Sequence, residues 1–168
     1  MQEGENEKLE EIFIKAYNEL SDAIFRHCYF RVSDREKAKD LVQEVFIKSW
    51  EHVSKGGEIK NYKAFLYKVA HNLIVDYYRK NKEYSLDNLI EKGMILESGD
   101  HKKFTDLVEA KESLKFVSQL EDKYKTSITM RFIDELSVKE ISEILGESEN
   151  NISVRIHRGL EKLRDLIR

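Results

Sequence analysis

From Ser137 to Arg168 the chain reads SVKEISEILGESENNISVRIHRGLEKLRDLIR, a stretch that contains start and stop signals for two consecutive helices. Ser137 and Glu140 match a capping box, in which the Ser137 hydroxyl accepts a hydrogen bond from the Glu140 amide and the Glu140 carboxylate accepts one from the Ser137 amide. Gly146 ends this first helix, because glycine adopts the left-handed conformation of a C-terminal cap without steric cost.

Ser148 follows shortly and is placed to cap a second, longer helix. The apolar residues of this helix recur at helical spacing and would pack on one side: Ile152, Ile156, Leu160, Leu163 and Ile167. Two helices joined by a short turn that contains glycine are typical of a helix-turn-helix unit.

The polar side of the second helix favours nucleic acid as its ligand. Near the N-terminus of this helix, where a recognition helix meets base edges and phosphates, lie Asn150, Asn151, Ser153, Arg155 and Arg158. Basic side chains outnumber acidic ones from residue 150 to the end of the chain. An ordinary helical hairpin with a solvated polar face is the alternative, and the pattern alone leaves it open.

The composition favours long helices throughout the chain. Of the 168 residues 36% are charged, and there are 7 glycines and no proline, so signals for tight β-turns are scarce. We therefore predict an all-α protein with one medium domain or two small ones. The net charge of -3 argues against a uniformly basic nucleic-acid coat protein and favours local basic patches on an acidic body.

The only cysteine, Cys28, cannot form an internal disulfide, which fits the reducing cytoplasm. The N-terminal residues lack the basic start and apolar core of a signal peptide, and the chain has no run of about 18 apolar residues. We expect a cytoplasmic protein without membrane insertion.

Two stretches of the N-terminal half combine helical periodicity with a distinctive polar face. In residues 40–53 an apolar seam leaves Asp40, Gln43, Glu44 and Ile47 on the opposite side, which could bind a partner helix or simply stay solvated. Residues 61–82 predict a helix in which aromatic side chains are interleaved with basic ones. Aromatic faces stack on unpaired bases and basic groups attract phosphates, although the same aromatics could equally form the core.

Periodicity weakens between residues 83 and 105, so we place a linker at residues 84–105 between domains at residues 1–83 and 106–168. Two further helices of the second domain should cover the apolar side of the helix-turn-helix. No Cys/His or carboxylate cluster has metal-ligand spacing, and the chain has no phosphate loop or nucleophile elbow. We therefore expect neither catalysis nor a cofactor.

Three stretches in this order resemble bacterial RNA polymerase sigma factors of the short, two-domain extracytoplasmic-function (ECF) type in the sigma-70 family. The stretch Asp40-Leu-Val-Gln-Glu-Val-Phe to Trp50 resembles the helix that binds core polymerase, and residues 65–80 resemble the helix that melts and reads the promoter −10 element. Residues 136–146, continued through 154–158, resemble the helix-turn-helix that reads the −35 element.

The resemblance implies roles for the ambiguous faces. Asp40, Gln43 and Glu44, with Ile47 among them, would grip the coiled coil of the polymerase β′ clamp. Lys68, His71 and Asn72 match positions that meet the −10 element, and four neighbours would assist in melting: Tyr62, Phe65, Tyr67 and Arg79. Asn151, Ser153, Arg155 and Arg158, beside Asn150, match the −35 recognition helix.

The expected partners are therefore core RNA polymerase, promoter DNA as duplex at −35 and single strand at −10, and an anti-sigma factor. The polymerase would perform the phosphodiester chemistry. Two rival interpretations remain: a helix-turn-helix regulator that acts without polymerase, and an all-α adaptor that binds only protein.

Overall fold

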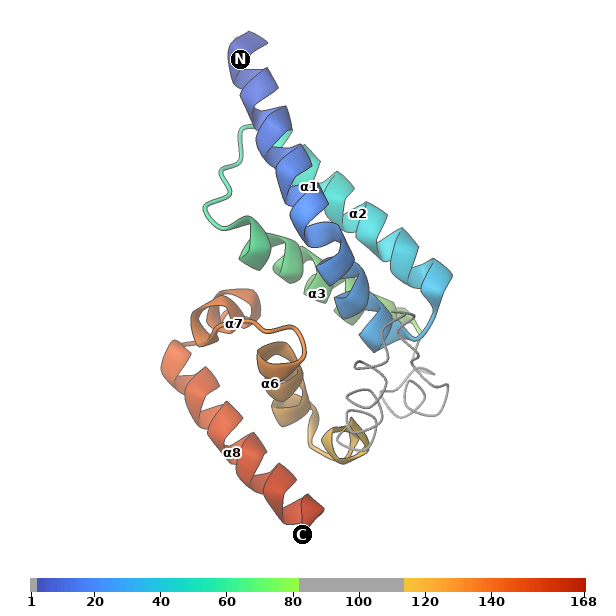
Figure 1. The fold of residues 1–168 in the computed structure, drawn as a ribbon, viewed down its shortest axis with the longest axis vertical. Coiled ribbons are helices and arrows are strands. Elements are labelled where there is room, and N and C mark those ends of the chain that lie inside the picture. The colour runs from blue at the N-terminus through green and yellow to red at the C-terminus, as the bar shows by residue number, and fades with distance from the viewer. Residues whose placement is uncertain (1–2, 82–113) are drawn as a thin grey trace, which may run out of the picture. The chain divides into compact units, whose positions relative to one another are not determined.

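The computed structural model describes residues 3–81 and 114–168, and the secondary structure within these ranges is entirely helical (Figure 1). This confirms the predicted all-α class. The chain divides into two compact units, Met1–Tyr84 and Ser85–Arg168. The predicted linker, residues 84–105, lies outside the described residues.

The N-terminal unit contains α1 (Glu3–Val32), α2 (Arg35–Ser54) and α3 (Tyr62–Lys80), and each of these helices packs against the other two (Figure 1). Asp34 caps α2 by accepting a hydrogen bond from the Lys37 amide at 3.0 Å. Asn61 caps α3 in the same way through the Ala64 amide at 3.1 Å. The core between the helices is apolar and includes Ile24, Cys28, Val45, Leu66, Ala70 and Ile74.

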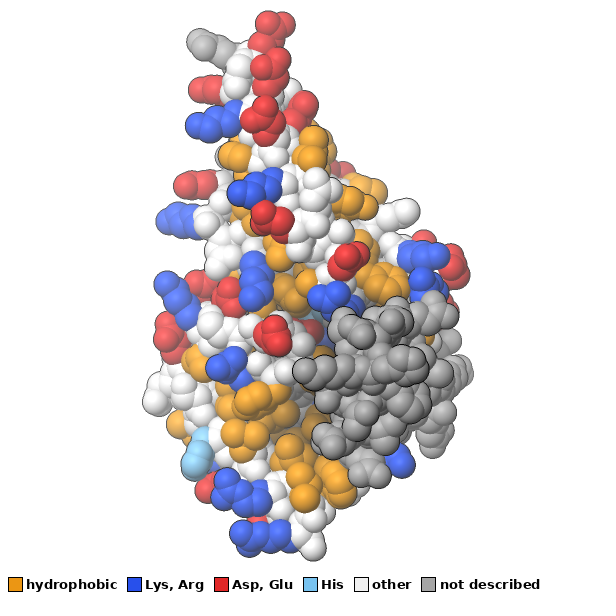
Figure 2. All heavy atoms as spheres, in the orientation of Figure 1, with side chains coloured by type: hydrophobic (Ala, Val, Ile, Leu, Met, Phe, Trp, Pro, Cys, Tyr) orange, Lys and Arg blue, Asp and Glu red, His pale blue; other side chains and the backbone are white. Residues whose placement is uncertain are grey.

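The N-terminal end of α1 lies outside this core. No residue between 3 and 15 is buried, and acidic side chains gather along this end of the helix (Figure 2). Acidic residues in the first turn of a helix favour its formation, because they compensate the positive end of the helix dipole.

The C-terminal unit contains α6 (Asp122–Phe132), α7 (Val138–Leu145) and α8 (Glu149–Ile167), preceded by a helical segment at residues 114–118. α6 packs along α8, and α7 contacts both. Helices α6 and α8 approach each other closely at Gly159 of α8, where an added Cβ would lie 3.0 Å from Cγ1 of Ile128 in α6. The apolar face of α8 is buried at Ile152 and Ile156, whereas Ile167 at the far end of the predicted stripe is 57% exposed.

Local signals set the ends of α7 and the start of α8, as predicted. The Ser137 amide donates to Glu140 Oε2 at 2.9 Å and the Glu140 amide donates to Ser137 Oγ at 3.1 Å, which completes the capping box. Gly146 takes the left-handed conformation with φ 67°. Ser148 then caps α8 by accepting from the Asn151 amide at 3.1 Å. The helix-turn-helix is therefore confirmed in the described residues.

Candidate protein and nucleic-acid interfaces

The predicted partner-binding face of α2 is exposed as one continuous surface. Asp40, Gln43 and Glu44 are exposed, and the Ile47 side chain beside them is 58% exposed although it is large and apolar. Glu44 contacts Lys48 across one helical turn at 3.9 Å, but both side chains are about half exposed, so water screens this pair and leaves the carboxylate available.

Aromatic packing on the opposite side of α2 fixes which way this face points. Phe13 of α1 meets Phe46 and Trp50 edge-on, with ring centroids 6.0 and 5.1 Å apart. Tyr17 contacts Phe46 as well, at 4.8 Å. Because these contacts and the buried Leu41 fill the inner side, the polar face cannot turn inward without emptying the core.

The outer side of α3 carries the predicted basic residues. Lys68, Asn72 and Arg79 are exposed, and His71 is partly exposed between them. Arg79 lies 3.6 Å from Asp76, an exposed pair that is screened by solvent. This surface therefore presents cations and amides that suit a nucleic-acid backbone.

The aromatic residues of α3 divide between surface and core, which the sequence pattern could not resolve. Tyr62 and Phe65 are partly exposed, and burial raises the pKa of the Tyr62 phenol above its ordinary value. Tyr67 is only 2% exposed, and its ring lies edge-on to His27 with centroids 5.0 Å apart. The prediction that Tyr67 contacts DNA is corrected, because its ring belongs to the core.

Sequence reasoning also missed His52, which supports the exposed end of α3. The His52 ring lies 5.0 Å from the Phe65 ring with a 33° tilt, and its backbone carbonyl accepts a hydrogen bond from the Gly57 amide at 2.9 Å. The ring covers Gly57 so closely that a Cβ there would collide with it. The Gly56-Gly57 pair after α2 was the available signal, since it marks a loop that folds back on the helix.

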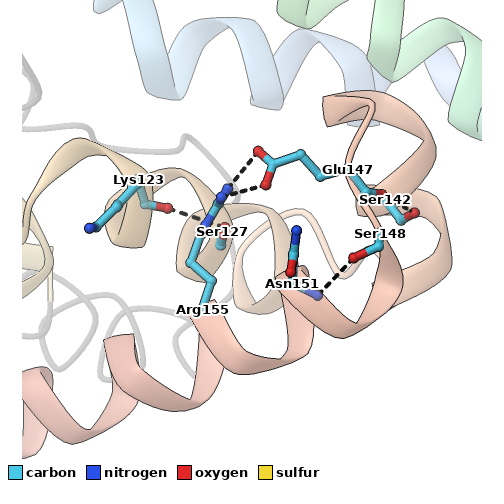
Figure 3. Close-up of polar contacts among 7 residues, drawn as sticks. All are labelled: Lys123, Ser127, Ser142, Glu147, Ser148, Asn151 and Arg155. Carbon is cyan, nitrogen blue, oxygen red and sulfur yellow. Dashed lines mark hydrogen bonds and ion pairs between the residues drawn. The ribbon is translucent and has the colours of Figure 1, made fainter.

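The helix-turn-helix presents most of its predicted residues at the surface. Asn150, Asn151, Ser153 and Arg158 are exposed in the first part of α8. Arg155 is different, because its guanidinium is held by the Glu147 carboxylate in the turn before α8 (Figure 3).

A hollow of about 430 Å³ lies between the start of α6 and the first part of α8. Four of the five residues predicted for −35 binding line it, and the sequence did not indicate the two lining residues from α6. The lining consists of Lys123, Tyr124, Asn150, Asn151, Val154, Arg155 and Arg158. Ser153 is not part of the lining. Lys123 was missed because it lies on a different helix, and only packing of α6 against α8 places it here. The hollow combines amide groups with cations, a mixture that suits base edges flanked by phosphates.

Comparison with known proteins identifies both units. Residues 16–84 match the family model for sigma-70 region 2, and residues 114–163 match that for sigma-70 region 4. The ECF RNA polymerase sigma factor SigW of Bacillus subtilis (strain 168) is 34% identical over 157 residues, which span 88% of this chain and 84% of SigW. The chain is an ECF sigma factor of the sigma-70 family.

Other sigma factors agree with this assignment. SigV of Bacillus subtilis (strain 168) is 33% identical over 83% of this chain and 81% of its own. The solved structure of the sigma factor RpoE from Bartonella quintana, in complex with the anti-sigma factor NepR, has a TM-score of 0.68 at 20% identity and covers 94% of this chain and 97% of that one. The similarity to RpoE establishes a shared fold.

The family match assigns each candidate surface of this sigma factor to one sigma-70 region. The exposed faces of α2 and α3 fall within region 2, and the helix-turn-helix with its hollow falls within region 4. Within the described residues, none of the helices combines the length and apolar character needed to cross a bilayer.

Proposed function

We propose that this sigma factor, which directs promoter-specific initiation of transcription, uses three separate binding surfaces. The α2 face would bind core polymerase, the outer side of α3 would bind the −10 element, and the α8 hollow would bind the −35 element. The observation that carries the proposal is their exposure. Nearly every residue predicted from the sequence for these roles reaches the surface, although the helices that carry them are otherwise half buried.

The α2 face supports binding to a helical partner. Asp40, Gln43 and Glu44 offer acceptors and one amide donor around the apolar Ile47, so a basic partner helix with one apolar contact would be complementary to it. The proposed partner is the coiled coil of the polymerase β′ clamp, and Ile47 is its apolar anchor.

The outer side of α3 supports capture of an opened strand. Lys68 and Arg79 supply positive charge for the backbone, while Phe65 and Tyr62 supply ring faces at the start of the helix. Stacking contributes about 1–3 kcal/mol per base and requires a base that has left the duplex, which links binding to strand opening. His71 and Asn72 are the proposed base contacts.

The α8 hollow supports binding to a duplex. Asn150, Asn151 and Ser153 are short polar side chains near the start of the helix, suited to base edges or phosphates in the major groove. Arg158 of α8 and Lys123 of α6 add positive charge to the lining. The proposed result is recognition of the −35 element.

We propose domains at residues 1–83 and 106–168 joined by a linker at 84–105, so that the two promoter elements are read by separately tethered units. The protein would work in the cytoplasm, where polymerase and promoters are found, and the polymerase would perform the catalysis. An anti-sigma partner is proposed as well, because structures of similar fold were solved as the CnrH complex with the cytosolic domain of CnrY and the RpoE complex with NepR.

The α3 and α8 surfaces are separable by experiment. Holoenzyme is reconstituted from purified bacterial core polymerase and incubated with a promoter pool. Lys68→Ala/Asn72→Ala should still bind core polymerase and select duplexes by their −35 sequence, yet fail to make −10 thymines reactive to permanganate. Asn151→Ala/Arg158→Ala should bind core polymerase but lose −35 selection.

If the chain without polymerase selects the same duplex as the holoenzyme does, an independent helix-turn-helix regulator explains the protein better. If neither the chain nor the holoenzyme selects any DNA, the adaptor interpretation stands.

A further inference from the structure

Among the predicted −35 contacts, Arg155 has a side chain that an acidic residue of the protein already binds. Its Nη1 donates to Glu147 Oε1 at 2.9 Å and its Nη2 donates to Glu147 Oε2 at 2.5 Å, a bidentate pair that joins the turn to α8 (Figure 3). The two side chains are 22% and 33% exposed, so solvent screens this pair less than it screens the more exposed pairs Glu44–Lys48 and Asp76–Arg79.

Glu147 is itself fixed to the end of α7. Its amide donates to the Ser142 carbonyl at 3.2 Å, and its carbonyl accepts from the Ser142 hydroxyl at 2.5 Å (Figure 3). The residue follows Gly146, whose left-handed conformation turns the chain at this point. The backbone of Glu147 is therefore held in place by its hydrogen bonds to α7. Because the Glu147 carboxylate binds Arg155 through two hydrogen bonds, it restricts the position of the guanidinium.

The pair changes what Arg155 offers to DNA. Two of the five N–H donors of the guanidinium are used by Glu147, which leaves three for another acceptor. The charge of the pair is neutral, so Arg155 contributes little to the attraction for phosphates that dominates sequence-independent affinity. A restrained guanidinium with free donors in a hollow lined by Asn150 and Asn151 is suited to a base edge instead.

We infer that Glu147 is a positioning residue for sequence discrimination at −35, because it holds Arg155 against base edges and keeps it from the phosphates. The inference rests on the proposed function of α8. Without Glu147, Arg155 becomes a mobile cation that binds any duplex more tightly through its backbone and distinguishes sequences less.

The test compares holoenzymes made from the full chain and bacterial core polymerase. Each is incubated with a duplex pool randomised across the −35 region and then with the best duplex and a mismatched one over a range of salt concentrations. Glu147→Gln removes the charge but keeps the side-chain length and the backbone bonds to Ser142. Glu149→Gln is the control, because it removes the same charge from the exposed first turn of α8 while leaving the pair in place.

Glu147→Gln should reduce the affinity ratio between the best and mismatched duplexes by at least about fivefold, the lower end of what one bidentate base contact provides. Its salt dependence should steepen by roughly 0.9 in the slope of log K against log salt, because one more cation faces the phosphates. The double variant Glu147→Gln/Arg155→Gln should lose discrimination too, but its slope should equal that of the wild type, since its net charge is unchanged.

Discrimination unchanged in Glu147→Gln would overturn the inference. An equal loss in Glu149→Gln would overturn it as well, because the effect would then follow from charge and not from holding Arg155. A wild-type holoenzyme that enriches no −35 sequence would instead remove the proposed function and the inference with it. Amide exchange of α7 and α8 in each variant verifies that the helix-turn-helix is intact.

Discussion

Replacing Gly146 by alanine tests whether one backbone conformation defines the helix-turn-helix. Gly146 ends α7 with φ 67° and ψ 32°, and nothing lies within 4 Å of the position that a Cβ would occupy. The substitution therefore creates no steric contact with the rest of the protein. Whatever stability is lost must come from forcing an L-residue into the left-handed region.

The magnitude follows from two opposing effects. An L-residue in the left-handed helical conformation costs about 1–2 kcal/mol. Alanine also restricts the unfolded chain, which stabilises the native state by about 0.4–1 kcal/mol. The net result for Gly146→Ala is a destabilisation of about 1 kcal/mol, equivalent to about a fivefold increase in the opening equilibrium of the surrounding structure.

Hydrogen exchange of the full chain, followed by mass spectrometry, measures this effect locally. Protection of peptides from α7 and α8 should fall about fivefold in Gly146→Ala, while peptides from α1, α2 and α3 keep their wild-type rates. Gly146→Asn is the matched variant and should lose less, because asparagine tolerates the left-handed conformation. Wild-type protection in Gly146→Ala, or an equal loss in Gly146→Asn, would refute the assignment of strain to this residue.

Three further outcomes are expected. Ser137→Ala removes half of the capping box and should cost about 1 kcal/mol, seen as faster amide exchange at the start of α7. Tyr67→Ala should destabilise the N-terminal unit by about 3–5 kcal/mol in denaturant titrations followed by Trp50 fluorescence; a stable variant impaired only in promoter opening would contradict the burial of this ring. Burial raises the pKa of Tyr78 above 10.0, with Arg31 opposing the shift, so the folded state resists ionisation and stability should fall as the pH rises beyond that value. Tyr78→Phe should make that fall shallower, and the same loss in both proteins would assign it to other groups.

The elements that the sequence predicted correctly are those whose signals are local. Ser137, Gly146 and Ser148 act through neighbours within four residues, so their caps form wherever the chain folds as a helix. The polar face of α2 was equally predictable, because helical periodicity alone separates Gln43 and Glu44 from the buried side.

The elements that the sequence did not predict depend on packing between segments. On α3, aromatic residues occur on several sides, and only the position of His27 on α1 shows that Tyr67 faces inward. Lys123 joins the α8 hollow because α6 lies against α8. The Glu147–Arg155 pair crosses a turn, and no helical spacing relates its two members.

Run-off transcription from a promoter pool with bacterial core polymerase tests the central claim most directly. Wild type is compared with Gln43→Ala/Glu44→Ala and with Asn18→Ala/Glu19→Ala. The second variant likewise removes one carboxamide and one carboxylate from exposed positions, here on α1, and its carboxylate lies in an equivalent exposed pair with Lys15 at 3.9 Å.

The account predicts promoter-specific transcripts with wild type and with Asn18→Ala/Glu19→Ala, and their loss with Gln43→Ala/Glu44→Ala. Transcripts of wild-type strength from Gln43→Ala/Glu44→Ala would contradict the assignment of the α2 face to core polymerase. The absence of any specific transcript with wild type and its cognate core would contradict the account as a whole.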